Sequence, residues 1–288
     1  MKNTLMLAAL VACASFSAYA QKEYKLQYSF KKGETFEWAQ SSSVKQHIAG
    51  PGFEQNNEST SKVSALMKVT EVTSTGAKFE MEYVKISTVS PQAGINMDSE
   101  GDTTKNMLNK IMQAMKGKKF NFTVSKAGII ESIENTDNLW SGVTAKNGFP
   151  DAQAGPMKAQ LENSFGKNAI KQGLESGFIK YPDNKIKVGL TWNNKTEIGV
   201  PIPLKTDYTW TLESATDPAG VLVGDGQITT TDTTKVVTLQ QGLKATTNFK
   251  GRRVLKGNVN LSTGWPETFK ILCRTKRIYD FACWWSNS

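Results

Sequence analysis

Apolar and polar residues alternate over residues 119–133, near the middle of the chain. This period of two is typical of a strand with one buried face, and the apolar positions before the turn are Phe120, Phe122 and Val124. Gly128 lies between the two alternating runs and can adopt the positive φ that closes a short hairpin. The pattern therefore predicts a β-hairpin at the centre of the fold.

Longer alternating stretches lie on both sides of this hairpin. Residues 21–98 contain several such runs, separated by turn sequences that include Gly33 and Gly76. The pattern returns in residues 181–265, after a turn at Pro182–Lys185. Runs of this length, bounded by Gly, Pro and Asn, are typical of antiparallel strands. We therefore expect one β meander in each half of the chain.

The two predicted meanders resemble each other in sequence. Phe30–Phe36 parallels Ile186–Trp192 in its Gly-x-Thr-aromatic ending, and Tyr208–Gly220 parallels Met67–Gly76. An internal duplication explains these parallels. Strand and turn propensities alone also produce shared features in unrelated meanders, so both explanations stand at this point.

A helical segment is predicted between the two halves. Asp102–Lys116 carries apolar residues at three- and four-residue steps, with its first residue as the cap and Gly117 as the stop. A short helical turn is expected near Asp137–Val143. Further helix is expected after Pro156, divided in two by glycines. The apolar stripe consists of Met107, Leu108, Ile111, Met112 and Met115.

Together these elements predict an α+β fold that is predominantly antiparallel β. Two similar β meanders form curved sheets, and a central helical segment and the hairpin pack on them. Residues 21–265 are expected to form a single domain, because this length suits one large hydrophobic core. Its β-rich halves, 21–98 and 181–265, are joined by residues 99–180.

The N-terminal residues have the features of an export signal. A lysine precedes the apolar run Leu5–Phe16, which is too short to span a bilayer. Ala-Tyr-Ala then supplies the small residues that a signal peptidase reads. We expect removal of residues 1–20 by cleavage between Ala20 and Gln21, which would deliver the protein to the periplasm or the exterior. The alternative is a bacterial lipobox at Leu10–Cys13, which would anchor the protein to the membrane through a lipid on Cys13.

The positive charge of the chain does not point to nucleic acid. The formal net charge is +9, most of it from scattered lysines whose densest cluster is Lys116–Lys119. Proteins that bind nucleic acid concentrate basic residues on one face and interleave aromatic ones. We therefore expect no nucleic-acid partner. After removal of the signal, no segment is apolar enough to cross a membrane.

Few residues suit catalysis or metal binding. His47 is the only histidine, no nucleophile elbow occurs near it, and together with Cys273 and Cys283 it is too sparse for zinc. The segment Asp98–Asp102 gathers three carboxylates, but Asn109 occupies the position of the bidentate glutamate in a calcium loop. We interpret this segment as a loop and helix cap, and assign no catalytic residue, metal or cofactor.

Aromatic and methionine residues raise the possibility of a ligand cavity. Curved sheets that are closed by Met-rich helices can hold acyl chains, although packing in the core is the interpretation that we prefer for these residues. The residues concerned are Trp38, Trp192 and Trp210, with Met107, Met112 and Met115. We expect a non-enzymatic binding or scaffold protein, whose partner would be a lipid or another apolar or amphipathic ligand. The alternative is a hydrolase of envelope polymers that uses carboxylates from separate strands.

The order of these motifs resembles an uncharacterised family of secreted or lipoprotein-like envelope proteins from Bacteroidota-type bacteria. The resemblance covers Gln21–Trp265 and implies location and architecture only, because no activity is established for that family. The motifs are the signal ending in Ala-Gln, Lys32–Phe36, Met97–Ser99 before a helix, Gly117–Phe120 with the Gly128 hairpin, Pro182–Trp192 and Ser262–Gly264.

Residues 266–288 depart from this pattern. They hold Cys273 and Cys283, and Phe281–Trp285 is an apolar cluster without strand alternation. We hypothesise a frameshifted end, in which case an edge strand is missing. The other explanation is a genuine terminal segment that docks its tryptophans into the core. Resequencing the end of the gene decides between them, and closely related tails in sister strains would contradict the frameshift.

Overall fold

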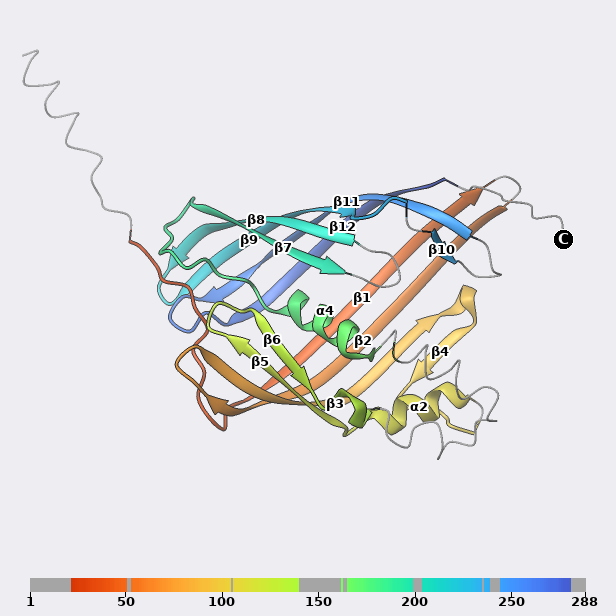
Figure 1. Ribbon diagram of the computed structural model, residues 1–288, viewed down its shortest axis with the longest axis horizontal. Coiled ribbons are helices and arrows are strands. Elements are labelled where there is room, and N and C mark those ends of the chain that lie inside the picture. The colour runs from red at the N-terminus through yellow and green to blue at the C-terminus, as the bar shows by residue number, and fades with distance from the viewer. Residues whose placement is uncertain are drawn as a thin grey trace, which may run out of the picture.

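The computed structural model describes residues 22–50, 53–104, 106–139, 162, 165–198, 204–234, 236–238 and 244–280. In these residues the chain forms two antiparallel sheets, and the helix α4 (Lys167–Gly177) lies between them (Figure 1). This arrangement confirms the predicted α+β fold with antiparallel strands predominating.

The first sheet consists of β1 (Thr35–Gly50), β2 (Phe53–Val72), β3 (Gly76–Ser90), β4 (Ile95–Asp98), β5 (Lys119–Ser125) and β6 (Ile130–Glu134). Its order is β1-β2-β3-β5-β6, and β4 pairs with the far half of β3. In β5 the buried residues are the predicted ones, Phe120, Phe122 and Val124. The predicted hairpin is therefore confirmed as β5–β6. It does not pack on the sheet as predicted, because β5 pairs with β3 and the hairpin supplies two strands of the first sheet.

The second sheet consists of β7 (Thr191–Ile198), β8 (Leu204–Thr216), β9 (Ala219–Thr230), β10 (Val236–Thr238), β11 (Lys244–Asn260) and β12 (Pro266–Asp280). β9 and β12 pair with the same stretch of β11, and so lie at its opposite edges. The main order is therefore β7-β8-β9-β11-β12, with β10 paired to the start of β11.

The two sheets repeat one another in detail, which supports an internal duplication. Gly33 and Gly189 precede the first strand of each sheet with φ of 86° and 85°. The N–H of each donates to the second strand, to the carbonyl oxygens of Val69 and Leu212 respectively, at 2.8 Å in both cases. A bulge follows each acceptor. Local propensity does not place long-range bonds and bulges at matching positions, so the duplication explains more than propensity does.

The first predicted helix is present but shorter than expected. It is α2 (Met107–Met115), and its cap is Asn106, whose side-chain oxygen accepts from the Leu108 N–H at 2.9 Å. The prediction that Asp102 caps this helix is wrong, because that carboxylate instead accepts from the N–H and hydroxyl of Thr104 and closes a local turn. The apolar stripe is correctly placed, with buried Ile111, Met112 and Met115.

The remaining helical predictions are met in part. A 3₁₀ turn, η2 (Thr136–Leu139), forms where a helical turn was expected, and residues 140–143 lie outside the described residues. Another 3₁₀ turn, η1 (Pro91–Ala93), follows β3. The helix predicted to begin at Pro156 also falls largely outside the described residues. Its second part is α4, which buries Ile170 and Leu174.

The segment 22–30 runs between the turns of two hairpins and connects the sheets. The Tyr28 N–H donates to the carbonyl oxygen of Lys126 in the β5–β6 turn, at 2.8 Å. The next N–H, of Ser29, donates to the carbonyl oxygen of Thr263 in the β11–β12 turn, also at 2.8 Å. The Trp265 indole N–H returns a bond to the Ser29 carbonyl oxygen at 2.9 Å. One short segment therefore binds both sheets.

Two buried tyrosines complete this junction. The Tyr28 hydroxyl accepts from the Ile179 N–H at 2.9 Å, and the Tyr181 hydroxyl donates to the carbonyl oxygen of Gly264 at 2.7 Å. The Tyr181 N–H donates to the carbonyl oxygen of Ala127. Burial raises the pKa of both tyrosines above the ordinary value, so the neutral hydroxyls persist as hydrogen-bonding groups. The segment before β7 thus joins the sheets in the same way as the segment before β1.

Glycine is required where the chain crosses these turns. Gly128 has φ of 84°, and a Cβ there would overlap the Ile179 carbonyl oxygen and come within 2.8 Å of the Tyr28 ring. Gly264, with φ of 70°, lies equally close to the Gln27 carbonyl group. The expectation that Gly128 turns the central hairpin is confirmed, and the close approach of two other segments adds a second reason for glycine.

The C-terminal residues form more regular structure than the sequence predicts. Residues 266–280 form β12, which pairs with β11 from Thr246 to Val259. β12 is an edge strand of the second sheet. Residues 281–288, with Cys283 and the two tryptophans, lie outside the described residues.

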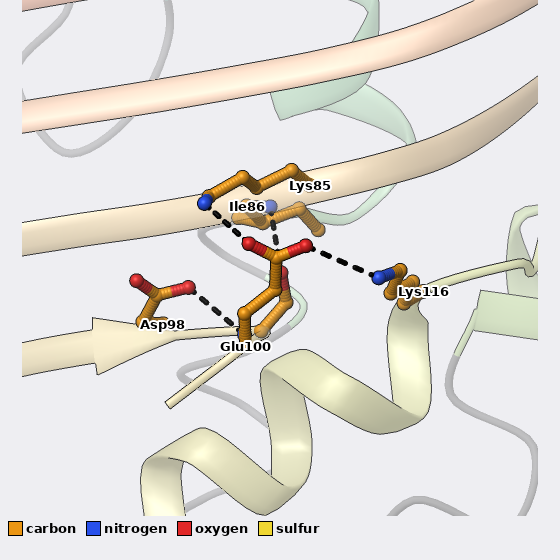
Figure 2. A network of polar contacts seen from close by, with 6 residues as sticks. Lys85, Ile86, Asp98, Glu100 and Lys116 are labelled. Carbon is orange, nitrogen blue, oxygen red and sulfur yellow. Dashed lines mark hydrogen bonds and ion pairs between the residues drawn. The ribbon is translucent and has the colours of Figure 1, made fainter. Parts of the chain in front are cut away.

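An ion-pair network fixes α2 and its preceding loop to the first sheet. The Glu100 carboxylate binds the ammonium groups of Lys85, on β3, and Lys116, after α2 (Figure 2). The Asp98 carboxylate accepts from the Glu100 N–H at 2.9 Å, and the Ser99 hydroxyl accepts from the Ile86 N–H. The bond from Lys85, and then that from Lys116, lowers the pKa of Glu100. These carboxylates hold a loop, as the sequence predicts.

We expect Gly128→Ala to lower the free energy of unfolding by about 3 kcal/mol, since the left-handed backbone and the overlap both cost energy. Gly33→Ala is the matched control, because Gly33 has nearly the same φ but open space around it. Its cost should be only about 1 kcal/mol, from backbone strain alone. Urea unfolding of both variants measures the difference, and equal losses would contradict a packed junction at Gly128.

We expect the Glu100 network to weaken at acidic pH. Because the pKa of Glu100 is lowered in the folded protein, its contribution is present above the ordinary glutamate pKa and is lost as pH falls through the lowered value. NMR titration of the carboxyl carbon measures this pKa directly. Lys85→Met should raise it more than Lys116→Met does, and the reverse order would show that Lys116 dominates.

Candidate functional site

A cleft of about 280 Å³ opens between the two sheets, beside the C-terminal end of α4. Three strands of the second sheet, β7, β8 and β11, form one wall. The start of β12, part of β1 and residues 175–180 form the rest. Aromatic, apolar, polar and charged side chains all line the cleft, among them Trp38, Glu175, Asn194, Tyr208, Trp210, Arg253 and Leu255.

The wall from the second sheet is organised in rows that cross the strands. One row contains Trp192, Trp210, Gly224 and Leu255, which are paired in register on β7, β8, β9 and β11. The next row contains Asn194, Tyr208, Gly226 and Arg253. Because residues two apart on a strand point to the same face, the rows lie side by side, about 7 Å apart. An apolar row therefore adjoins a polar one.

Two glycines on β9 leave the space that the aromatic rings of β8 occupy on this wall. A Cβ at Gly224 would come within 2.9 Å of the Trp210 ring, and one at Gly226 within 2.6 Å of the Tyr208 ring. The rings thus lie across a strand that carries no side chain at these points. The sequence signal was Gly224-Asp-Gly226 inside an alternating strand, which indicates close approach by another group.

Hydrogen bonds fix the edge of this wall. The Trp192 indole N–H donates to the Lys180 carbonyl oxygen at 3.0 Å, and the Asn194 amide N–H donates to the same oxygen at 2.9 Å. The Trp210 indole N–H donates to the Asn194 side-chain oxygen at 3.3 Å. Trp192 stacks on Trp210 with ring centroids 6.2 Å apart. The polar groups of these aromatic residues are therefore satisfied within the wall.

The opposite wall is formed by Trp38 on β1 and the end of α4. Trp38 also lines a second, smaller cavity of about 150 Å³ between α4 and the first sheet. That cavity is largely apolar, and its lining includes Met81, Phe120 and Leu174. Trp38 and Gln40 line both cavities, so the smaller cavity adjoins the cleft at these two residues.

Two adjacent arginines differ in their surroundings. Arg252 points away from the cleft and binds the Asp225 carboxylate with two hydrogen bonds, at 2.8 and 2.7 Å. Arg253 is half-buried and lines the cleft. In the part of the chain that the structure describes, no hydrogen bond or ion pair engages its guanidinium. The other positive group of the cleft is the Lys180 ammonium, whose Nζ is 3.6 Å from the Glu175 Oε1.

The structure separates the residues proposed for a cavity. Trp38 and Trp210 line the cleft, and Trp192 stacks behind Trp210. Met112 and Met115 are buried in the core and do not line the cleft. Sequence reasoning did not single out Arg253, since its neighbour is also arginine and alternation alone does not tell which of the two faces inward.

The remaining sequence candidates do not join this site. His47 is paired in register with Asn56 on β2, and Cys273 with Arg253 on β11. Cys13, Ala20, Gln21 and Cys283 lie outside the described residues. Within the described residues, no group of three or more His, Cys, Asp or Glu side chains is placed to hold a metal ion.

Comparison with known proteins identifies one family. No curated protein and no solved structure matches the chain. None of the helices described here is long and apolar enough to cross a membrane. The model of DUF6263, a family of unknown function, matches residues 73–266, from the β2–β3 turn to the start of β12. This match includes β3–β6 of the first sheet, β7–β11 of the second sheet and the two hairpin turns of the junction, and the chain therefore belongs to the DUF6263 family.

Proposed function

We propose that the protein is an exported, non-enzymatic envelope protein that holds an apolar or amphipathic molecule in the cleft between its sheets. The observation that carries this proposal is the cleft wall, where an aromatic row adjoins a polar one. A concave site with apolar walls and a few placed polar groups is the usual form of a small-molecule site. The smaller apolar cavity beyond Trp38 supports it, because an apolar tail would find further space there.

A hydrolase is less well supported by this cleft. Hydrolysis by carboxylates requires two of them to face each other across the substrate. The glutamates of the cleft come from β1, α4 and β12, and the carboxylate from α4, Glu175, is occupied by Lys180. Glu37 also lines the cleft, but it is exposed to solvent. No observation specifically favours an enzyme.

Export rests on the sequence of residues 1–20, and so does the choice between a soluble and a lipid-anchored form. We expect mass spectrometry of the mature protein from its native envelope to give an N-terminus at Gln21. A diacylglyceryl group on Cys13 would replace this by lipid anchoring, and retention of residues 1–20 in the mature protein would contradict export.

Ligand binding can be tested with an uncharged fluorescent dye, N-phenyl-1-naphthylamine. We expect one dye molecule to bind per protein, with enhanced emission. Trp38→Ala should weaken binding by at least about fivefold, because this ring contacts both cavities. Leu66→Ala is the matched control, since Leu66 lies exposed on the neighbouring strand, and its affinity should stay unchanged. A dye that does not bind the wild-type protein would contradict the proposed function.

A further inference from the structure

We infer that the ligand of this cleft is an anionic amphipath, whose negative group is bound by Arg253 and whose apolar part lies on Trp210 and Leu255. The inference rests on the proposed function and adds the chemical class of the ligand. It follows from three features of the cleft: the position of Arg253 within the rows, the absence of a partner for its guanidinium among the described residues, and the pairing of Lys180 with Glu175.

The rows place one positive charge beside apolar surface. Arg253 stands in the polar row with Tyr208, and Leu255 stands two residues further along the same strand, in the apolar row with Trp210. The distance between rows is about 7 Å, so a head group bound in the polar row leaves methylenes several bonds further along the chain in contact with the apolar row. A single molecule with a negative head and an apolar tail therefore spans both rows.

The Arg253 guanidinium is available to such a head group. Its neighbour Arg252 is bound by Asp225, but no described residue bonds the Arg253 guanidinium. A half-buried charge without a partner is unfavourable, and an anion relieves this cost with bonds that are stronger than neutral ones. Two planar N–H groups fit a carboxylate or phosphate in a bidentate manner, so both chemistries share this recognition.

The remaining charges of the cleft do not compete for this role. Lys180 is engaged by Glu175 and by the Lys195 carbonyl oxygen. Glu37 and Glu267 also line the cleft, but both are exposed to solvent, and within the described residues neither forms an ion pair with Arg253. The Arg253 guanidinium is therefore the positive group of the cleft that has no ion-pair partner among the described residues, and it lies beside the apolar row. The geometry selects an anion over a neutral amphipath, and disfavours a cation.

The test compares two competitors of equal chain length for the bound N-phenyl-1-naphthylamine, decanoate and decan-1-ol. In the wild-type protein, decanoate should displace the dye at about tenfold lower concentration than decanol, as expected for a charge-assisted bond. Arg253→Gln should remove this preference, whereas Arg253→Lys should keep part of it. Arg252→Gln is the matched control on the opposite face of the same strand, and should leave the preference unchanged. Circular dichroism of each variant verifies folding.

The outcomes separate this inference from the proposed function. Failure of the dye to bind the wild-type protein would overturn both. Dye binding with equal displacement by decanoate and decanol would retain a cleft for apolar molecules but overturn the anionic class. A preference for decanoate that survives in Arg253→Gln would overturn the assignment of the head group to Arg253. An alkyl phosphate of the same length, used in place of decanoate, then tells whether the site favours carboxylate or phosphate.

Discussion

Two consecutive backbone N–H groups, of Tyr28 and Ser29, hold the two sheets together. Each donates to a different hairpin turn, one from each sheet, and the Tyr28 ring packs against Phe178 and Trp265. Successive N–H groups of an extended chain point to opposite sides, so a single extended segment can bind a turn on either flank. The arrangement requires both turns to approach closely, which explains the glycines at positions 128 and 264. Backbone hydrogen bonds thus fix the end of the molecule at which the β5–β6 and β11–β12 turns meet residues 22–30.

This constraint also determines where a cleft can form. The sheets meet at the junction, and α4 lies between them (Figure 1). α4 buries Ile170 and Leu174 and lines the cavity above the first sheet, while its C-terminal end borders the cleft to the second sheet. The inner face of the second sheet therefore lines a cleft that is open to solvent, and a ligand can reach its apolar and polar rows.

Features that depend on the local residue pattern, such as strands and turns, could be predicted from the sequence. Features that depend on the register between distant strands, such as the cleft, could not. Alternation and turn residues were enough to place the hairpin at residues 119–133 and the turn at Gly128. The cap of α2 was misassigned because Asp102 and Asn106 are both good caps, and only the local turn at Thr104 distinguishes them. The cleft depends on pairing between strands that are far apart in sequence. Alternation could not tell which of Arg252 and Arg253 faces inward.

The junction at Tyr28 and Ser29 is the central claim, and amide hydrogen exchange tests it most directly. If this segment joins the sheets into one cooperative unit, its two amides should exchange as slowly as the core amides of β3 and β9, through global unfolding alone. The free energies of opening obtained for both sheets should then agree. Exchange of the Tyr28 and Ser29 amides at loop-like rates, or separate opening of the two sheets, would contradict the account.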